Sequence, residues 1–199
     1  MVKKYADGVG AYLKFSSLIG ARPVEFYAFV TSFTQTFTSN WNKESVYGRN
    51  DPIGTFQGTE RTISVGWDVP SGNIADAKAN LSKMGTLVKL LYPAYSTSRQ
   101  GKEGQVTAGV NALSLSKSPL VRLSYGNLIT NSQKGQGLLG WISSVSWNPV
   151  IDMGMFTGSD KKMYPKVVSL SIEFNVLHEH DLGILPGGGG TPAKFPFGG

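Results

Sequence analysis

Within residues 165–177, the strict alternation of apolar and polar residues from 168 to 176 is the feature of this sequence that most constrains its fold. One parity holds Val168, Leu170, Ile172, Phe174 and Val176, and the other holds Ser169, Ser171, Glu173 and Asn175. Successive side chains of a β-strand point to opposite faces, so the pattern predicts a strand with one buried and one polar face. Residues 62–69 repeat it, with Ile63, Val65, Trp67 and Val69 opposite Thr62, Ser64, Gly66 and Asp68. Half-buried strands of this kind favour an antiparallel sheet.

Three further segments are predicted as strands and two as loops. The strands are 24–41, which is long enough to bend or form a hairpin, 119–129 and 137–151. In the last of these, one face is expected to hold Leu139, Trp141, Val145 and Trp147, opposite Gly140 and Ser144. Trp67, Trp141 and Trp147 fall on apolar parities, which predicts that they lie in the core. Turn residues predict loops at 42–61 and 95–118.

One amphipathic helix is predicted between Asn73 and Pro93. Asn73 is placed to cap it, and Asp76 lies in its first turn. Lys78, Lys83 and Lys89 are expected on its solvent face. The apolar stripe is formed by residues that step by three and four, namely Ile74, Ala77, Leu81, Met84, Val88 and Leu91.

The order strand, strand, helix, strand, strand, strand predicts a mainly β fold. We expect an antiparallel sheet, folded as a β-sandwich or small barrel, with one flanking helix. A chain of 199 residues fits one domain. The expected organisation is an N-terminal arm at 1–20, a β domain at 21–183 and a Gly/Pro-rich tail at 184–199.

Composition excludes several classes of function. The chain has 0 cysteines, which excludes disulfides, zinc–thiolate sites and thiol nucleophiles. Its formal charge is +6, but the bases are scattered rather than gathered in a patch, which argues against sequence-specific DNA binding. No apolar run approaches a signal peptide or a membrane span, so the chain is expected to be soluble and without direct membrane binding.

His178 and His180 are the residues closest to a catalytic or metal-binding pattern. Both fall at the end of the predicted strand, two residues apart, so they could point the same way. Glu179 projects oppositely, and Asp181 has the wrong parity for a third ligand unless the strand bends. Nucleophile, phosphate-loop and H-E-x-x-H motifs are absent from the sequence. We therefore expect no enzyme activity, metal or cofactor. A small metal-binding enzyme domain using His178, His180 and Asp181 remains the alternative of another class.

Four segments in order carry a resemblance to a known family: "YGRNDPIGTFQGTERTISVGWDVP" with the helix after it, "PLVRLSYGNLI", "GLLGWISSVSWNPVIDMGMF" and "MYPKVVSLSIEFNVLHEHDLG". Over about 45–183 the chain resembles the tube-forming domain of tailed-bacteriophage tail and baseplate proteins, particularly the tube initiators of contractile tails. The resemblance implies a virion structural protein without an active site. Six copies would pair their sheets edge to edge into a hexameric ring, and the genome would pass through its lumen during ejection.

The same resemblance assigns roles to particular residues. Polar residues of the two alternating strands become candidates for the lumen face: Thr62, Ser64, Asp68, Ser169, Ser171, Glu173 and Asn175. These residues are small and not basic, as suits a channel that passes double-stranded DNA without gripping phosphates. Subunit-interface candidates are Arg49, Asp51, Arg61, His178, Glu179 and His180. The alternative is that these polar residues are the ordinary solvent face of a monomer.

The expected partners are other copies of the chain, the adjacent tail tube, and hub and wedge proteins of the baseplate. Assembly is expected in the host cytoplasm, and the final location in the virion tail. The long predicted loops and the two terminal segments favour a baseplate-proximal tube initiator. The main tail tube subunit is the alternative within the same class.

Overall fold

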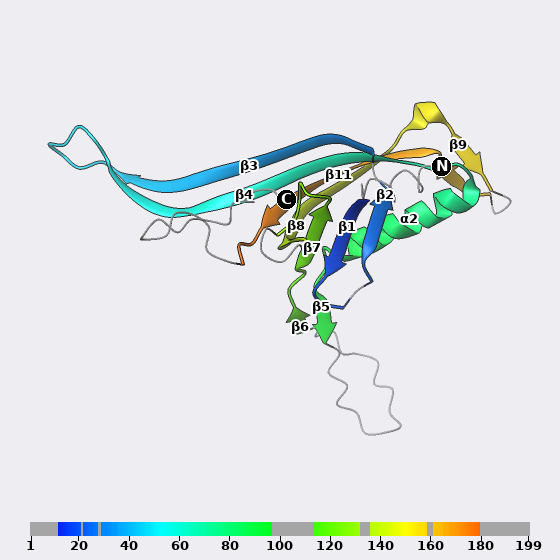
Figure 1. Ribbon diagram of the computed structural model, residues 1–199, viewed down its shortest axis with the longest axis horizontal. Coiled ribbons are helices and arrows are strands. Elements are labelled where there is room, and N and C mark those ends of the chain that lie inside the picture. Colours follow the sequence, from blue (N-terminus) through cyan, green and yellow to red (C-terminus); the bar gives the residue numbers. More distant parts are fainter. Residues whose placement is uncertain are drawn as a thin grey trace, which may run out of the picture.

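The fold is built on one seven-stranded antiparallel sheet, seen in the computed structural model in Figure 1. The structure describes residues 12–20, 22–27, 29–96, 114–131, 136–158 and 161–179. The strand order is β2-β1-β7-β8-β11-β4-β3. These strands are β1 (Tyr12–Ser17), β2 (Val24–Tyr27), β3 (Phe29–Glu44), β4 (Ile53–Pro70), β7 (Val121–Tyr125), β8 (Leu138–Pro149) and β11 (Val167–Val176).

Smaller elements complete the fold. The strands β5 (Ala94–Ser96) and β6 (Ser114–Lys117) pair with each other, as do β9 (Met155–Thr157) and β10 (Met163–Pro165). A short 3-10 helix, η1 (Ile151–Met153), precedes β9, and α2 (Ile74–Lys89) is the one long helix of the described chain. The predicted class, a mainly antiparallel β fold with one flanking helix, is confirmed. Among the described residues, no helix is both long and apolar enough to span a membrane.

The sheet curls so that its first strands lie over its later ones. Three strands separate β1 from β4 in the sheet order, yet the Phe15 and Trp67 rings are 6.1 Å apart. Phe26 of β2 also contacts Trp67, with 5.6 Å between ring centroids. Met84, Leu87 and Leu90 of the helical segment pack into the same core. The two ends of one sheet and the helix therefore enclose a single hydrophobic core.

The two alternating segments form neighbouring interior strands of the sheet, β4 and β11, each with one buried and one polar face as the sequence predicts. The apolar residues of 63–69 and 168–176 are all buried, and β4 and β11 pair antiparallel over nine residues. Helix α2 also agrees, because the Asn73 side chain accepts a hydrogen bond from the Asp76 N–H at 2.8 Å. Its buried stripe includes Leu87 in place of Val88, because 3.6 residues per turn brings position 87 round to the sheet.

The predicted loop at 42–61 is wrong. Residues 42–44 continue β3 and residues 53–61 belong to β4, so the two strands form one long hairpin whose turn lies at 45–52. The hairpin extends far beyond the body in Figure 1. Gly54, one of the turn residues behind that prediction, lies within the ladder opposite Lys43, and the register shifts between Asn40 and Trp41. A bulge there absorbs an extra residue without ending the strand.

The predicted core position is confirmed for Trp67 but wrong for Trp141 and Trp147, and the predicted face at the start of β8 is wrong as well. Trp67 is in the core, whereas Trp41, Trp141 and Trp147 are 54%, 42% and 47% exposed. The buried face at the start of β8 holds Leu138, Gly140 and Ile142, because Gly140 leaves room for the Phe174 ring. A register shift then occurs between Ile142 and Ser144, and it returns Val145 to the core side. Counting parity along the sequence cannot foresee that shift.

The terminal segments are only partly described. Residues 12–17, expected in the N-terminal arm, form β1, and their Leu13 and Phe15 are fully buried. The helix lysines, expected to face solvent, also make contacts: Lys78 Nζ lies 5.0 Å from the Tyr164 ring centroid. Residues 1–11 and the predicted tail at 184–199 lie outside the described residues.

Candidate functional site

The seven lumen-face candidates come together on one face of β4 and β11. Direct cross-strand partners are Thr62 with Asn175, Ser64 with Glu173, Gly66 with Ser171, and Asp68 with Ser169. Thr62 Oγ1 donates to Asn175 Oδ1 at 3.2 Å, and Ser169 Oγ donates to Asp68 Oδ1 at 2.6 Å. These cross-strand hydrogen bonds hold the short polar side chains against the sheet.

Two neighbouring strands widen this polar face. Ser32, Thr34 and Thr36 of β3 lie beside β4. On the other side, β8 places Ser144, Ser146 and Asn148 beside β11. We call this four-stranded surface of β8, β11, β4 and β3 the polar face. We consider the residues of the polar face at positions 62, 64, 66 and 68 of β4 together with their cross-strand partners. The charged residues among them are the carboxylates Asp68 and Glu173, and none is a lysine or arginine.

Both margins of the polar face are open in the described chain. On one side, β3 ends the sheet along residues 29–44. On the other, β7 pairs with β8 only along Leu138–Gly140, which leaves residues 142–149 of β8 without a strand on that side. Open strand margins present main-chain N–H and C=O groups to any strand that approaches them. Trp147, on the core side of this margin, is half exposed.

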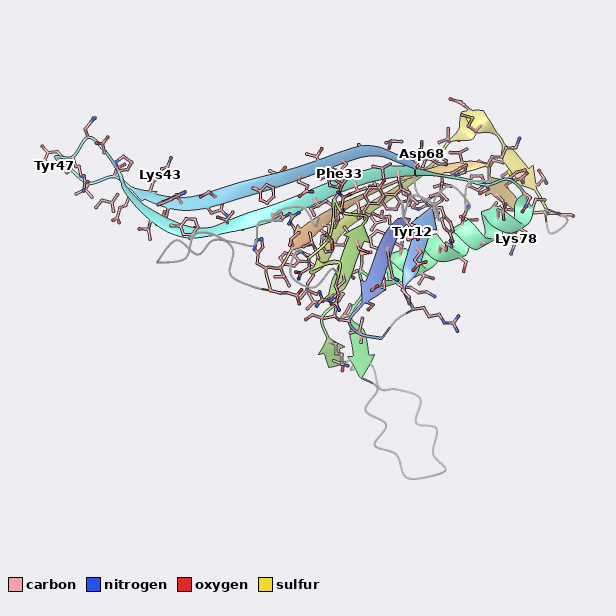
Figure 2. The ribbon with its side chains drawn as sticks, in the orientation of Figure 1. Tyr12, Phe33, Lys43, Tyr47, Asp68 and Lys78 are labelled. Atoms are coloured by element: carbon pink, nitrogen blue, oxygen red, sulfur yellow. The ribbon has the colours of Figure 1, made fainter. Side chains whose placement is uncertain are left out.

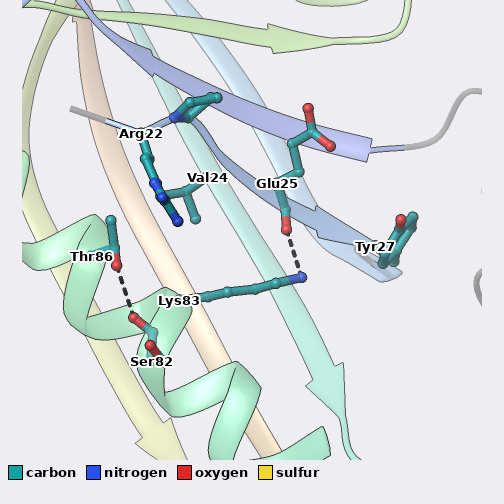
Figure 3. A pocket seen from close by; sticks show the side chains of 8 residues that line it. Arg22, Val24, Glu25, Tyr27, Ser82, Lys83 and Thr86 are labelled. Carbon is teal, nitrogen blue, oxygen red and sulfur yellow. Dashed lines mark hydrogen bonds between the residues drawn. The ribbon is translucent and has the colours of Figure 1, made fainter. Parts of the chain in front are cut away.

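The other edge strand of the seven-stranded sheet is β2, and it lies against helix α2. A groove of about 400 Å³ separates β2 from α2, with Arg22, Glu25, Tyr27, Ser82, Lys83 and Thr86 among its lining residues (Figure 3). Lys83 Nζ crosses the groove and donates to the main-chain oxygen of Glu25 at 3.0 Å. It also lies 5.4 Å from the Tyr27 ring centroid. Lys83 of the helix therefore occupies a main-chain acceptor of the edge strand β2 that an added strand would need.

The subunit-interface candidates do not form one cluster. Arg49 and Asp51 are exposed in the hairpin turn, and His178 is exposed just after β11. Arg61 is only 2% exposed, because it occupies the core-facing side of β4. Its Nε and Nη2 donate to Gln35 Oε1 at 3.1 and 2.6 Å, and its guanidinium lies over the Phe37 ring. Burial lowers the pKa of Arg61 to about 10, since it disfavours the charged form.

The carboxylate of Glu179 is held by hydrogen bonds at the end of the sheet. Its two carboxylate oxygens accept hydrogen bonds from Arg122 Nη1 and Nη2 at 2.7 and 2.6 Å. Asn131 Nδ2 adds a third at 3.3 Å. The hydrogen bond to Glu179 raises the pKa of Arg122 above its usual value. The pair therefore fastens the segment after β11 to β7.

We predict that Glu179→Gln lowers the free energy of unfolding by about 1–2 kcal/mol. The change removes the charge that strengthens two hydrogen bonds to a partly buried guanidinium. Glu173→Gln, which alters an exposed carboxylate on the polar face, is the matched control and should change stability by less than about 0.5 kcal/mol. Urea unfolding followed by tryptophan fluorescence measures both, and equal stability for the two variants would contradict the assigned role of Glu179.

The metal-binding alternative is not supported by a described cluster. Among the residues that the structure describes, no three His, Asp or Glu side chains are grouped so that they could hold a metal ion. His180 and Asp181, which that alternative requires, lie outside the described residues.

Sequence reasoning missed two exposed apolar surfaces. One is on the outer half of the hairpin and includes Trp41, Tyr47 and Phe56. The other surrounds β9 and β10 and includes Met153 and Met163. The aromatic residues at 41–56 were visible as a signal, but interpreting this segment as a loop hid their arrangement along a hairpin.

Comparison with known proteins gives only distant structural likenesses. No family model and no curated protein matches the sequence. The Dit protein of phage SPP1, described as a paradigm of the hub adsorption apparatus in phages that infect Gram-positive bacteria, matches with a TM-score of 0.39 and 9% identity. The match covers 82% of this chain and 49% of that one, so the chain spans about half the length of Dit. A chain from the tail of an empty GTA particle, reconstructed with C6 symmetry, matches with a TM-score of 0.33 and 11% identity, over 84% of this chain and 91% of that one. Both TM-scores are too low to establish a shared fold or function.

Proposed function

We propose that this protein is a structural subunit of a bacteriophage tail, which closes with other copies into a hexameric ring around a channel for the genome. The polar face would line the channel, and the opposite face of the sheet would remain in the core of each copy. The observation that carries the proposal is a four-stranded strip whose two margins are open among the described residues and whose polar face holds no lysine or arginine beside residues 62 to 68 of β4.

The strand directions of the strip suit closure by identical copies. Each neighbouring pair from β8 to β3 is antiparallel, so β3 and β8 run in opposite directions. When copies related by rotation stand side by side, β3 of one would meet the 142–149 margin of β8 of the next in antiparallel orientation. The ladder would then continue around the ring with the same pattern, and closure would leave no exposed margin.

The size of such a ring suits duplex DNA. Six copies of the four-stranded strip would give about 24 strands, spaced about 4.8 Å apart. The circumference would be at least about 115 Å and the diameter about 37 Å, before strand tilt widens it. A duplex would pass with water around it, and the two carboxylates per copy would repel rather than bind its phosphates.

We predict that Ser171→Arg converts the channel into a DNA-binding surface. Ser171 is exposed on the polar face between Gly66 and Ser146, so each ring would gain six guanidinium groups around the channel. In a gel-shift assay with linear duplex at about 50 mM salt, the variant ring should bind at least tenfold more tightly than wild type. Binding should fall steeply as salt is raised.

The control for this prediction is an arginine elsewhere on the surface. Gly85→Arg adds the same charge on the exposed side of α2, away from the polar face. DNA binding by Gly85→Arg as strong as by Ser171→Arg would show that added charge alone is sufficient. It would contradict the assignment of the polar face to the channel wall.

Within the tail, we propose the position of a baseplate-proximal tube initiator in a contractile tail, next to the tube and to hub and wedge proteins. One of the two long loops that favoured this position is a hairpin, so the main tail tube subunit stands as the close alternative. Antibody labelling of virions tests the choice. Label confined to the baseplate end supports an initiator, whereas label along the whole tail identifies the main tube subunit.

A further inference from the structure

The groove between β2 and α2 has the walls of a site for an extended chain. One wall is the four-residue edge strand β2, and the other is the stretch of helix that carries Ser82, Lys83 and Thr86 (Figure 3). In a groove of this kind, the main chain of an added strand pairs with the strand edge, and its side chains contact the helix. The groove therefore offers two different walls to one bound segment.

The main chain of Glu25 faces this groove. Its carbonyl oxygen accepts the hydrogen bond from Lys83 Nζ, so it points toward the helix and away from β1. In an antiparallel strand, the N–H and C=O of one residue point to the same side, and those of the residue two positions along do so as well. Glu25 and Tyr27 thus both present main-chain groups to the groove, as an edge strand does to an incoming strand.

The side chains around the groove give it a positive charge. Arg22 and Lys83 line it together with Glu25, a net charge of 2 − 1 = +1. The Glu25 carboxylate lies 3.0 Å from Lys14 Nζ, and counting Lys14 raises the sum to 3 − 1 = +2. Because the charge of Glu25 is compensated by Lys14, the exposed guanidinium of Arg22 and the ammonium of Lys83 favour a ligand that carries carboxylates.

The position of Lys83 makes the groove selective between neutral and acidic segments. A strand that pairs with β2 must displace the Lys83 ammonium from the Glu25 oxygen, and this hydrogen bond is exposed to solvent. A neutral segment leaves the displaced ammonium with water alone. An acidic segment provides a carboxylate for it, and hydrogen bonds between two charged groups are stronger than those between neutral ones. The exchange therefore favours an acidic segment.

We propose that this groove binds an extended, acidic segment of a partner protein, which adds to β2 as a further strand. Lys83 moves from the Glu25 oxygen to one carboxylate of the segment, and Arg22 binds another. The bound segment thus gains main-chain hydrogen bonds from the strand and charge recognition from the two basic side chains.

This site is separate from the proposed ring. One copy supplies every lining residue, and neither β3 nor the 142–149 margin of β8 is among them. Helix α2 packs on the core side of the sheet, opposite the polar face, and Figure 2 labels Lys78 on the helix and Asp68 on the sheet. In a ring, the partner would therefore bind outside the channel.

A labelled peptide tests the site on the purified full-length protein. The probe is a hexapeptide of alternating glutamate and valine, blocked at both ends, and fluorescence anisotropy measures its binding at low salt. We expect saturable binding, at least about tenfold tighter than for the same peptide with glutamine in place of glutamate, and weaker at high salt. No binding of the glutamate peptide, or equal binding of the glutamine peptide, would overturn the proposal.

Variants of the two basic residues locate the binding. Lys83→Met keeps an unbranched apolar stem and frees the Glu25 oxygen, so the preference for glutamate over glutamine should fall to about twofold. Arg22→Gln should weaken binding of the glutamate peptide by about threefold or more.

Lys89→Met is the matched control for Lys83→Met, because it removes the same charge from an exposed position of α2 outside the groove. It should leave the preference unchanged, and circular dichroism checks that all three variants are folded. A preference that survives in Lys83→Met, or that Lys89→Met lowers equally, would place the binding elsewhere and contradict the proposed site.

Two further probes separate strand addition from simple anion binding. Methylating the main-chain nitrogens of every second residue removes the N–H groups from one edge of an extended peptide. Of the two peptides methylated on glutamate or on valine, one should lose binding and the other should keep it. Free glutamate with the same total concentration of carboxylate should not displace the probe. An identical effect of the two methylations, or displacement by free glutamate, would overturn strand addition to β2.

Discussion

Replacing Gly140 by alanine is expected to destabilise the protein by about 3 kcal/mol or more. A Cβ at this position would collide with the main-chain oxygen of Asn175 and lie 2.8 Å from Cζ of Phe174. One of these neighbours is backbone in the central strand β11, and the other is a fully buried ring. Neither can move without disturbing the core, so the strain of overpacking is large. The expected loss is a large fraction of the total stability of a domain this size.

A second glycine provides the matched control for this prediction. Gly85 lies in the middle of α2 with open space where its Cβ would be. Gly85→Ala should therefore stabilise the protein by about 0.5–1 kcal/mol, through the higher helix propensity of alanine. Urea unfolding of both variants measures the difference. A Gly140→Ala variant as stable as wild type would show that β8 does not approach Phe174 this closely.

Replacing Val145 by proline is expected to abolish ring formation while leaving the monomer folded. The Val150 N–H donates to the Val167 oxygen at 3.0 Å. Main-chain groups alternate in direction along an antiparallel ladder, so the N–H of Val145 points to the open margin of β8. Proline lacks that donor. Pro149 already occupies a position of the same direction in this strand.

Two control variants separate assembly from folding. Val145→Ala removes more of the side chain but keeps the N–H, so it should still form rings. Ser146→Pro removes an N–H that points toward β11, and it should destabilise the fold by about 3 kcal/mol. Mass photometry and circular dichroism measure assembly and folding on the same samples. Rings formed by Val145→Pro at wild-type yield would contradict the assigned margin.

Sequence patterns predict the centre of this fold well because that centre obeys one local rule. In β4 and β11 the parity of each residue decides its face, and the polar face follows directly from Thr62 to Asp68 and from Ser169 to Asn175. The cap of α2 at Asn73 is equally local.

The features that sequence patterns miss depend on other parts of the chain. The face of Trp141 depends on the contact between Gly140 and Phe174 and on the register shift that follows. The turn residues at 50–54 mark the tip of a hairpin or an irregular loop equally well, and only pairing across β3 and β4 separates them. Arg61 faces the core because Gln35, from the neighbouring strand, provides an acceptor there. The open margin of β8 depends on the length of β7.

The most direct test of the ring is electron cryomicroscopy of the purified wild-type protein. We predict closed annular particles in which β3 of each copy lies antiparallel to residues 142–149 of β8 in the next, with Ser64, Ser171 and Glu173 facing the channel. Two results would contradict the ring model. One is particles that remain single copies even at high protein concentration, and the other is rings in which these three side chains face outward.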